Sequence, residues 1–309
     1  MTFEHYIRLR AIPNRPETYF KYVTAKVAKI ILVSHKLRWS SPLLFNDPFD
    51  VQRDFDLGFD IEELKEPLTK EILRLISAEQ IPDLSGNPSA AYLVNLLRRK
   101  GYTDIRNMIL EELAHLLDEG IQHTKKSSYE EIKSQWSEFI PEFRILCFSS
   151  VHDNPLMWSH YSDSHTGAVL EFQSIPSLDS AWLVAQPVIY QTSPPMLATI
   201  DEWVKILTGQ QSLDLLSVFT KYACTKTPEW EYEKEWRVVS FCREGETGYF
   251  SDYGFDPREL CSVYLGCDIS QEDESDITSL LKFDLAHVRT FHGNKLDRER
   301  RLSFERMKP

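Results

Sequence analysis

The chain has 309 residues, of which 42% are hydrophobic and 12% aromatic, so it can bury a large core and is not a disordered chain. Its formal net charge of −12 argues against general nucleic-acid binding and against attraction to an anionic membrane surface. No apolar run is long enough to span a membrane, no signal-peptide pattern opens the chain, and the five cysteines lack paired CxxC spacing. We therefore expect a reduced, cytoplasmic protein without a membrane partner.

The first elements along the chain are a strand, a helix and a second strand. Aromatic and polar residues alternate over residues 18–22, and Thr24 can cap a helix in which apolar residues recur at helical spacing. Residues 37–40 predict a strand that places alternate side chains on opposite faces. Residues 41–50 contain two prolines and no period, which indicates a loop.

The next region changes character and predicts a helical block over residues 61–140. Amphipathic patterns cover residues 61–76, 90–99, 102–117 and 129–139. The stripes favour packing against a core, and a protein partner docked on the block is the alternative. We expect residues 1–309 to form a single α+β domain in which 61–140 is an insertion.

The central stretch predicts a strand, a polar turn, a helical turn and a returning strand. Residues 143–148 are apolar, residues 149–155 form a turn cluster, and Trp158 and Tyr161 lie three residues apart on one helical face. Gly167 then precedes an apolar run over 168–172. We expect Trp158 to serve packing, whereas Tyr161 and Ser149 are candidates for ligand contact.

The C-terminal part is rich in strands. We expect strands at 181–190 (broken by Pro187), 235–242, 260–265, 287–291 and 302–307, and helices at 200–222 and 276–281. Strands on both sides of a helical block favour an α+β fold with a mixed, mainly antiparallel sheet over regular βαβ winding. The tail after residue 297 is rich in arginine, but interleaved acidic residues make a solvated face the favoured interpretation.

Two polar segments could carry chemistry. In the loop 45–50, Asn46 and Asp47 precede Pro48, which is typical of a tight turn, and Asp47 or Asp50 could instead lie at the mouth of a cleft. Residues 228–237 contain four glutamates at alternate positions, followed by Arg237. Glu235 and Arg237 would share a strand face, either as a structural salt bridge or as a site carboxylate positioned by an arginine.

Several functions find no support in the motifs. The chain has no G-x-S-x-G, G-x-G-x-x-G or Walker motif, which argues against hydrolase, Rossmann and kinase functions. His160 has no nucleophile beside it that would make it a general base. A nuclease in which Asp47, Asp50, Glu171 and Glu235 bind Mg²⁺ is a minor alternative, and we predict no metal site.

In combination, these segments resemble a bacterial family of unknown function, DUF2971. The matching segments are Phe20–Tyr22, Leu37–Pro42, Phe45–Asp50, Cys147–Ser149, Met157–Tyr161 with Gly167, Trp230–Arg237 and Val263–Gly266. The resemblance spans roughly residues 18 to 292. It is expected to be weakest in the block 61–140.

The order of the motifs is similar to that of ADP-ribosyltransferases, which act on NAD. This similarity implies a split sheet, NAD as substrate, a cationic or polar residue on the first strand and a glutamate on the last. The implied first residue is Lys21 or Arg38, the implied central ones are Ser149 and Tyr161, and the implied catalytic glutamate is Glu233 or Glu235. The chain departs from the pattern in having no clear His-Tyr-Glu or Arg-Ser-Glu triad.

Two function hypotheses follow. The first is an NAD-using ADP-ribosyltransferase or NAD glycohydrolase, acting as a toxin or defence effector. The second is a non-catalytic module that senses a small nucleotide ligand or binds a protein through the block 61–140. In both, the expected ligand-binding residues are Lys21, Arg38, Ser40, Asn46, Asp47, Ser149, Tyr161 and Arg237. The sequence leaves open which of Glu231, Glu233 and Glu235 enters the cleft.

Overall fold

The computed structural model describes residues 15–51, 56–100, 126, 129–296 and 298–308. Contacts divide the chain into two compact units. Unit 1 comprises Met1–Gln52, Phe139–Thr192 and Ala223–Pro309, and unit 2 comprises Arg53–Glu138 and Ser193–Tyr222. The single-domain organisation expected from the sequence stays a prediction.

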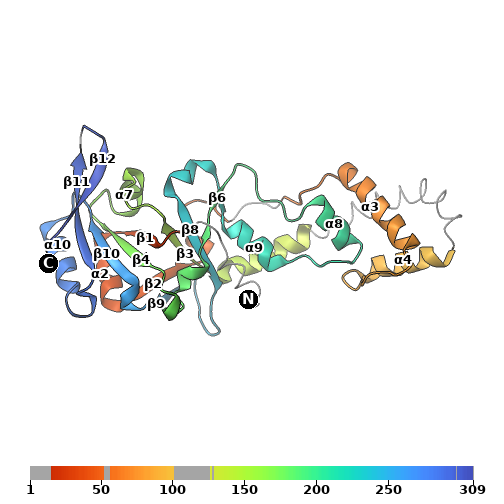
Figure 1. Cartoon of the computed structure of the whole chain (residues 1–309), viewed down its shortest axis with the longest axis horizontal. Coiled ribbons are helices and arrows are strands. Elements are labelled where there is room, and N and C mark those ends of the chain that lie inside the picture. The colour runs from red at the N-terminus through yellow and green to blue at the C-terminus, as the bar shows by residue number, and fades with distance from the viewer. Residues whose placement is uncertain (1–14, 52–55, 101–125, 127–128, 297, 309) are drawn as a thin grey trace. The chain divides into compact units, whose positions relative to one another are not determined.

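Unit 1 is built on a mixed, mostly antiparallel sheet, which confirms the predicted α+β class (Figure 1). Its main strands follow the order β12-β11-β10-β4-β1-β3-β2-β9, and β8 pairs with β3 and β5. Only β10 and β11 run parallel among these pairs. The strands are β1 (Thr18–Val23), β2 (Lys36–Ser40), β3 (Phe143–Ser149), β4 (Ala168–Gln173), β5 (Gln186–Pro187), β8 (Glu235–Phe241), β9 (Phe250–Gly254), β10 (Leu260–Leu265), β11 (Arg289–Leu296) and β12 (Arg301–Arg306). A separate parallel pair consists of β6 (Ile189–Tyr190) and β7 (Thr225–Lys226).

The sheet is weakly joined at β3. Strand β8 pairs with the whole of β3, whereas β1 meets β3 at the single register pair Phe20↔Ser149 and β2 meets it at Ser40↔Ile145. Between these two points, the carbonyl of Cys147 accepts a hydrogen bond from the Lys21 ammonium at 2.8 Å. A side chain thus occupies the position where a neighbouring strand would otherwise pair.

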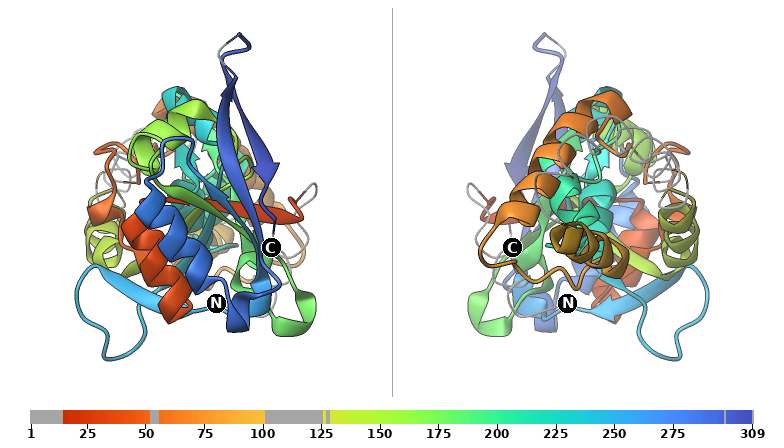
Figure 2. Two further views of the ribbon diagram at one scale, coloured as in Figure 1. Left: turned by 90° about the vertical axis from the view of Figure 1, so that its left-hand side faces the viewer. Right: turned by 90° about the vertical axis from the view of Figure 1, so that its right-hand side faces the viewer.

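One face of this sheet is covered by α2 (Ala25–Ser34) and α10 (Gln271–Leu280), which lie side by side (Figure 2). Thr24 caps α2 by accepting a hydrogen bond from the Val27 N–H, as the sequence predicted. The main core lies on this face, where Tyr19, Phe148 and Phe172 pack with residues of both helices. Burial of these large aromatic side chains contributes to the stability of this layer.

The other face carries α7 (Pro155–Tyr161), which Asn154 caps at its N-terminus. The Asn154 side chain accepts hydrogen bonds from the first turn of the helix, and its amide donates to the Tyr232 carbonyl at 2.9 Å. Trp158 is fully buried in a second cluster beneath the helix, which confirms its packing role. Phe304 of β12 stacks on Trp158, with ring centroids 5.6 Å apart.

The loop after α7 has an uncommon backbone conformation. Asp163, Ser164 and His165 are consecutive residues with positive φ, a region that side chains rarely adopt. The loop lies so close to the end of β10 that a Cβ atom at Gly266 would stand 1.9 Å from the His165 carbonyl oxygen. Gly266 also donates a backbone hydrogen bond to Gly167, so the loop and the sheet fix one another.

Unit 2 contains α3 (Ile61–Ser77), α4 (Pro88–Lys100) and α8 (Ile200–Leu207). It also contains all but the last residue of the helical segment 129–139 and of α9 (Leu215–Ala223). Helix α3 packs against α4 and α8. Trp136 packs against Phe219, with ring centroids 4.7 Å apart. The helices predicted at 61–76, 90–99 and 129–139 are confirmed, and the predicted helix 102–117 lies outside the described residues.

Some predicted elements differ from the structure. Residues 181–190 are not one strand, because Ala181–Val184 forms a 3₁₀ turn that buries Trp182, and only β5 and β6 follow. The helix predicted over 200–222 is two helices, interrupted near Gly209, whose φ is +80°. Strand β9 was not predicted. Further short 3₁₀ segments are Pro42–Leu44, Ile140–Glu142, Pro176–Leu178, Pro228–Glu233, Pro257–Glu259 and Phe283–Leu285.

Candidate functional site

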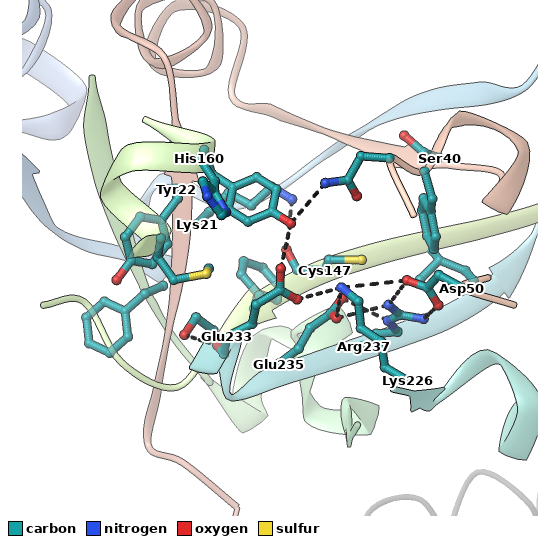
Figure 3. A pocket seen from close by; sticks show the side chains of 18 of the residues that line it. Lys21, Tyr22, Ser40, Asp50, Cys147, His160, Lys226, Glu233, Glu235 and Arg237 are labelled. Atoms are coloured by element: carbon teal, nitrogen blue, oxygen red, sulfur yellow. Dashed lines mark hydrogen bonds and ion pairs between the residues drawn. The ribbon is translucent and has the colours of Figure 1, made fainter. Parts of the chain in front are cut away.

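A pocket of about 460 Å³ opens in unit 1 next to the weak junction of the sheet (Figure 3). Its wall is formed by β1, β2, β3 and β8, by the loop 45–50, by α7 and by the 3₁₀ segment Pro228–Glu233. These elements come from the three sequence segments that form unit 1, so the fold brings distant motifs to one place.

Glu233 is the carboxylate on which several of these elements converge. The Tyr161 hydroxyl donates to Glu233 Oε1 at 2.5 Å, and the Lys226 ammonium donates to Oε2 at 2.6 Å. Asn46 in turn donates to the Tyr161 hydroxyl at 3.3 Å. Both oxygens of this buried carboxylate are therefore held in place by groups from α7 and β7.

Arg237 organises the second half of the buried charges. Its guanidinium forms a bidentate pair with Asp50, at 2.8 and 2.6 Å, and a second bidentate pair with Glu235, at 2.8 and 2.9 Å. Lys226 lies 3.4 Å from Glu235 and 3.7 Å from Asp50, so it links both halves. We call these five residues, Asp50, Lys226, Glu233, Glu235 and Arg237, the charge cluster.

The local backbone explains how two glutamates so close in sequence reach the same pocket. Glu233 ends a 3₁₀ segment, and Lys234 has a φ of 46°, in the left-handed region. Glu235 then begins β8 with regular strand geometry. Ser149 supports this turn, because its hydroxyl donates to the Glu233 carbonyl oxygen at 2.6 Å.

The two glutamates differ in their pKa. Burial and the neighbouring Glu235 charge raise the pKa of Glu233 above its ordinary value, although Lys226 opposes the shift. Burial also acts to raise the pKa of Glu235, but Arg237 and Lys226 outweigh it and hold that pKa well below the ordinary value. The surroundings therefore fix Glu235 as an anion and leave Glu233 more easily protonated.

Most of the residues expected at the site line this pocket, namely Lys21, Arg38, Ser40, Asn46, Ser149, Tyr161, Glu233, Glu235 and Arg237. The Arg38 guanidinium is paired with Asp252 in a bidentate manner and stacks over Phe250, with 3.8 Å between its central carbon and the ring centroid. Glu231 is exposed and pairs with Lys234, so Glu233 and Glu235 are the two glutamates of this segment that enter the pocket.

Asp47 does not line the pocket. Its Oδ1 accepts a hydrogen bond from the Phe49 N–H at 2.9 Å, which is the tight turn that the Asn46-Asp47-Pro48 sequence favoured. This turn directs the next carboxylate of the loop, Asp50, to Arg237. The loop thus contributes Asn46 and Asp50 to the site.

Lys226 is the main residue that the sequence did not reveal. It lies in the two-residue strand β7, and its side chain is almost fully buried. No local pattern marks such a lysine, because its burial depends on pairing with three carboxylates that only the fold brings to it. His160 and Tyr232, joined by a hydrogen bond of 2.9 Å, lie beside Tyr161 and Glu233 in sequence.

The carboxylates considered for Mg²⁺ do not gather at one point. Asp50 and Glu235 are held by Arg237, whereas Glu171 accepts a hydrogen bond from Tyr264, outside the pocket lining. Among the described residues, no group of three or more His, Cys, Asp or Glu could hold a metal ion. No described helix is long and apolar enough to cross a membrane.

A comparison with known protein families finds a match for the segment that carries most of the site. Residues 157–238 match the family described as "Protein of unknown function (DUF2971)". The match supports the resemblance that the motifs predicted and covers this segment of the chain, from α7 to β8, through Tyr161, Lys226 and the charged residues of β8. No curated protein and no solved structure matched the chain.

Proposed function

We propose that the pocket of unit 1 cleaves the bond between nicotinamide and ribose in NAD and passes the ADP-ribosyl group to water or to an acceptor. The observation that carries this proposal is Glu233. It is a buried carboxylate at the wall of an open pocket, fixed on both oxygens by Tyr161 and Lys226. The weak β1–β3 junction beside it supports the proposal, because a split sheet is what similarity to ADP-ribosyltransferases implies.

The electrostatics of the charge cluster suit this reaction. Its three carboxylates exceed its two cations, which leaves a formal charge of −1 when all are ionised. The nicotinamide ring of NAD is positively charged, and the ribose becomes an oxocarbenium-like cation as the bond breaks. An anionic wall that is already in place stabilises such charge without reorganising during the step.

The step balances as follows. The bond between ribose C1′ and the ring nitrogen breaks, and its electron pair goes to that nitrogen, so neutral nicotinamide leaves. Glu233, hydrogen-bonded to the ribose 2′-hydroxyl, would stabilise the positive charge on the sugar. A water molecule then bonds to C1′ and releases one proton to solvent, which gives ADP-ribose, or an acceptor hydroxyl takes the place of water.

The pocket also offers partners for the rest of the substrate. Phe45 and Tyr161 present aromatic rings on which nicotinamide could stack. Lys21 lines the pocket from β1 and is the candidate for pyrophosphate contact, because its ammonium has three donors and donates to the Cys147 carbonyl, whereas the Arg38 guanidinium is engaged by the carboxylate of Asp252. The proposal therefore assigns the cationic role to Lys21.

The test is the release of nicotinamide from NAD, measured by chromatography with the purified chain. Glu233→Gln preserves side-chain volume and should lower the rate by at least about 100-fold, on the scale of other transition-state electrostatic contacts. Glu231→Gln is the matched control, because Glu231 lies two residues away on the exposed side. Unchanged NAD after prolonged incubation, with and without protein and nucleic-acid acceptors, would contradict the proposal.

One observation favours the second hypothesis, a ligand-sensing pocket. Each member of the charge cluster is paired with another member, so the cluster is stable without any reaction. A thermal-shift panel of nucleotides on the same preparation separates the two hypotheses. A nucleotide that raises the melting temperature and is recovered intact would establish binding without turnover.

A further inference from the structure

The wall that α7 contributes to the pocket carries a second polar side chain next to Tyr161, namely His160. His160 lines the pocket together with Glu233 and is exposed to solvent. Figure 3 shows His160 and Glu233 on adjoining walls of the pocket. The cleavage step described above leaves this imidazole without a role.

Two hydrogen bonds join the end of α7 to the segment that precedes β8. Tyr161 donates to Glu233, and one residue earlier along the helix the Nδ1 atom of His160 lies 2.9 Å from the Tyr232 hydroxyl oxygen. The Asn154 amide donates to the carbonyl oxygen of the same tyrosine. The His160 ring is therefore held at Nδ1 by a residue that is itself anchored to the N-terminus of α7.

The other ring nitrogen of His160, Nε2, has no hydrogen-bond partner among the described residues. In the tautomer with its proton on Nδ1, the ring donates to the Tyr232 hydroxyl oxygen and keeps a lone pair on Nε2. The imidazole is then able to accept a proton at Nε2. A histidine that is oriented through Nδ1 and open at Nε2 has the arrangement of a general base.

We propose that His160 is the general base of the reaction and that the acceptor is an O–H group, of water or of an alcohol. This inference rests on the function proposed above. The acceptor oxygen forms its bond to C1′ while its O–H bond breaks, and the proton passes to Nε2 of His160 and from there to solvent. The acceptor itself is thus the nucleophile that the sequence does not place beside His160.

The charge cluster favours a neutral acceptor of this kind. Its negative formal charge, which stabilises the sugar cation, repels a carboxylate acceptor. A hydroxyl meets no such repulsion, but it is a weak nucleophile until a base removes its proton. Each carboxylate of the cluster is already paired with Lys226 or Arg237, whereas Nε2 of His160 is open.

The experiment compares nicotinamide release from NAD by the full-length chain and its variants. His160→Ala should lower the rate by about 100-fold or more, on the scale of other general-base contributions. His292→Ala is the matched control, because the His292 side chain is 34% exposed and lies outside the pocket lining. The rate of this control should equal that of the wild type.

Added imidazole separates a chemical role of His160 from a structural one. It should restore part of the rate of His160→Ala, and the restoration should grow as pH rises, because only neutral imidazole accepts a proton. Glu233→Gln should gain nothing from imidazole. Tyr232→Phe should lower the rate less than His160→Ala does, because Tyr232 is a positioning residue that acts through His160.

The class of acceptor is tested with methanol and acetate added at equal concentration. Mass spectrometry should find ADP-ribose and its methyl glycoside, and an acetate ester as the main product would overturn the assignment of an O–H acceptor. Cleavage by His160→Ala at the wild-type rate, or a slow variant that imidazole does not restore, would overturn the role of His160 and leave the proposed function standing. Absence of nicotinamide release by the wild type would overturn both.

Discussion

The charge cluster has two halves, Asp50 and Glu235 around Arg237 and Glu233 beside Lys226, and they hold similar carboxylates with different partners. Glu235 and Asp50 are clamped by the planar fork of Arg237, whereas Glu233 is held by a phenol and an ammonium. The first half has a depressed glutamate pKa and the second a raised one. The comparison shows that two glutamates only two residues apart can have opposite pKa shifts, because one is bound by the planar guanidinium of Arg237 and the other by an ammonium and a phenol.

Removing the Arg237 guanidinium should have the largest effect on stability. Arg237→Met leaves two buried carboxylates with only Lys226 nearby, and we expect the free energy of unfolding to fall by about 3–5 kcal/mol. Urea denaturation followed by near-ultraviolet circular dichroism measures this loss. A loss as small as that of the exposed control Arg258→Met would show that the Arg237 clamp is not structural.

Neutralising each glutamate in turn sharpens the comparison. Glu235→Gln should cost about 1.5–3 kcal/mol, because it replaces charged hydrogen bonds to Arg237. Glu233→Gln should cost less than about 1 kcal/mol, since the surroundings of Glu233 disfavour its ionised form. Denaturation of the two variants side by side is the measurement, and equal losses would remove the distinction between the halves.

Acidification should change the stability contributions of Glu235 and Glu233 in opposite directions. The pKa of Glu235 is depressed in the folded chain, so its contribution to stability is complete above its ordinary pKa of 4.5 and is lost as pH falls through the folded pKa. The raised pKa of Glu233 contributes stability in the opposite direction, as pH falls. Between pH 5 and acid unfolding, Glu235→Gln should lose less stability than the wild type on acidification, and a parallel decline would contradict this.

Lys226→Met tests the group that joins the halves. Without the ammonium, the pKa of Glu233 should rise further, because Lys226 is the main charge that lowers it. The pH at which NAD cleavage reaches half its maximum should then move upward. Should the profile keep its position while only the rate falls, Lys226 would act on folding rather than on Glu233.

The smallest effect belongs to the exposed pair at the pocket edge. Arg38→Ala removes a bidentate contact with Asp252, yet both side chains are largely exposed, at 56% and 41%. The free energy of unfolding should change by less than about 0.5 kcal/mol. A larger loss in thermal denaturation would mean that Arg38 stabilises the pocket edge through Phe250.

Local pattern predicted the elements whose burial alternates along the chain. Strand β2, with Leu37 and Trp39 buried, and helix α3 are such cases. Strand β9 was not predicted, because most of its few residues are exposed and the strand depends on pairing with β2. The first part of the strand expected at 181–190 was wrong, because Ala181–Val184 buries Trp182 alone and lacks the alternating burial of a strand.

The candidate site was predictable where a residue's local turn decides its direction. Asn46, Ser149 and Tyr161 flank turns or lie on a short helix, and all three reach the pocket. Asp47 was expected there too, but its own turn engages it first. Lys226 was beyond local reasoning, because only tertiary pairing with carboxylates makes a lysine stable in a buried strand.

The left-handed conformation of Lys234 has a consequence for how this segment can vary. It ends the 3₁₀ segment and returns the chain to the strand β8, so the carboxylates of Glu233 and Glu235 both enter one pocket although only Glu235 belongs to the strand. The identity of residue 234 can therefore change among types that tolerate positive φ, such as glycine or asparagine. An inserted or deleted residue cannot be accommodated in the same way, because it would turn one carboxylate away from the other. Relatives that retain the pocket should differ at position 234 more readily than in the length of this segment.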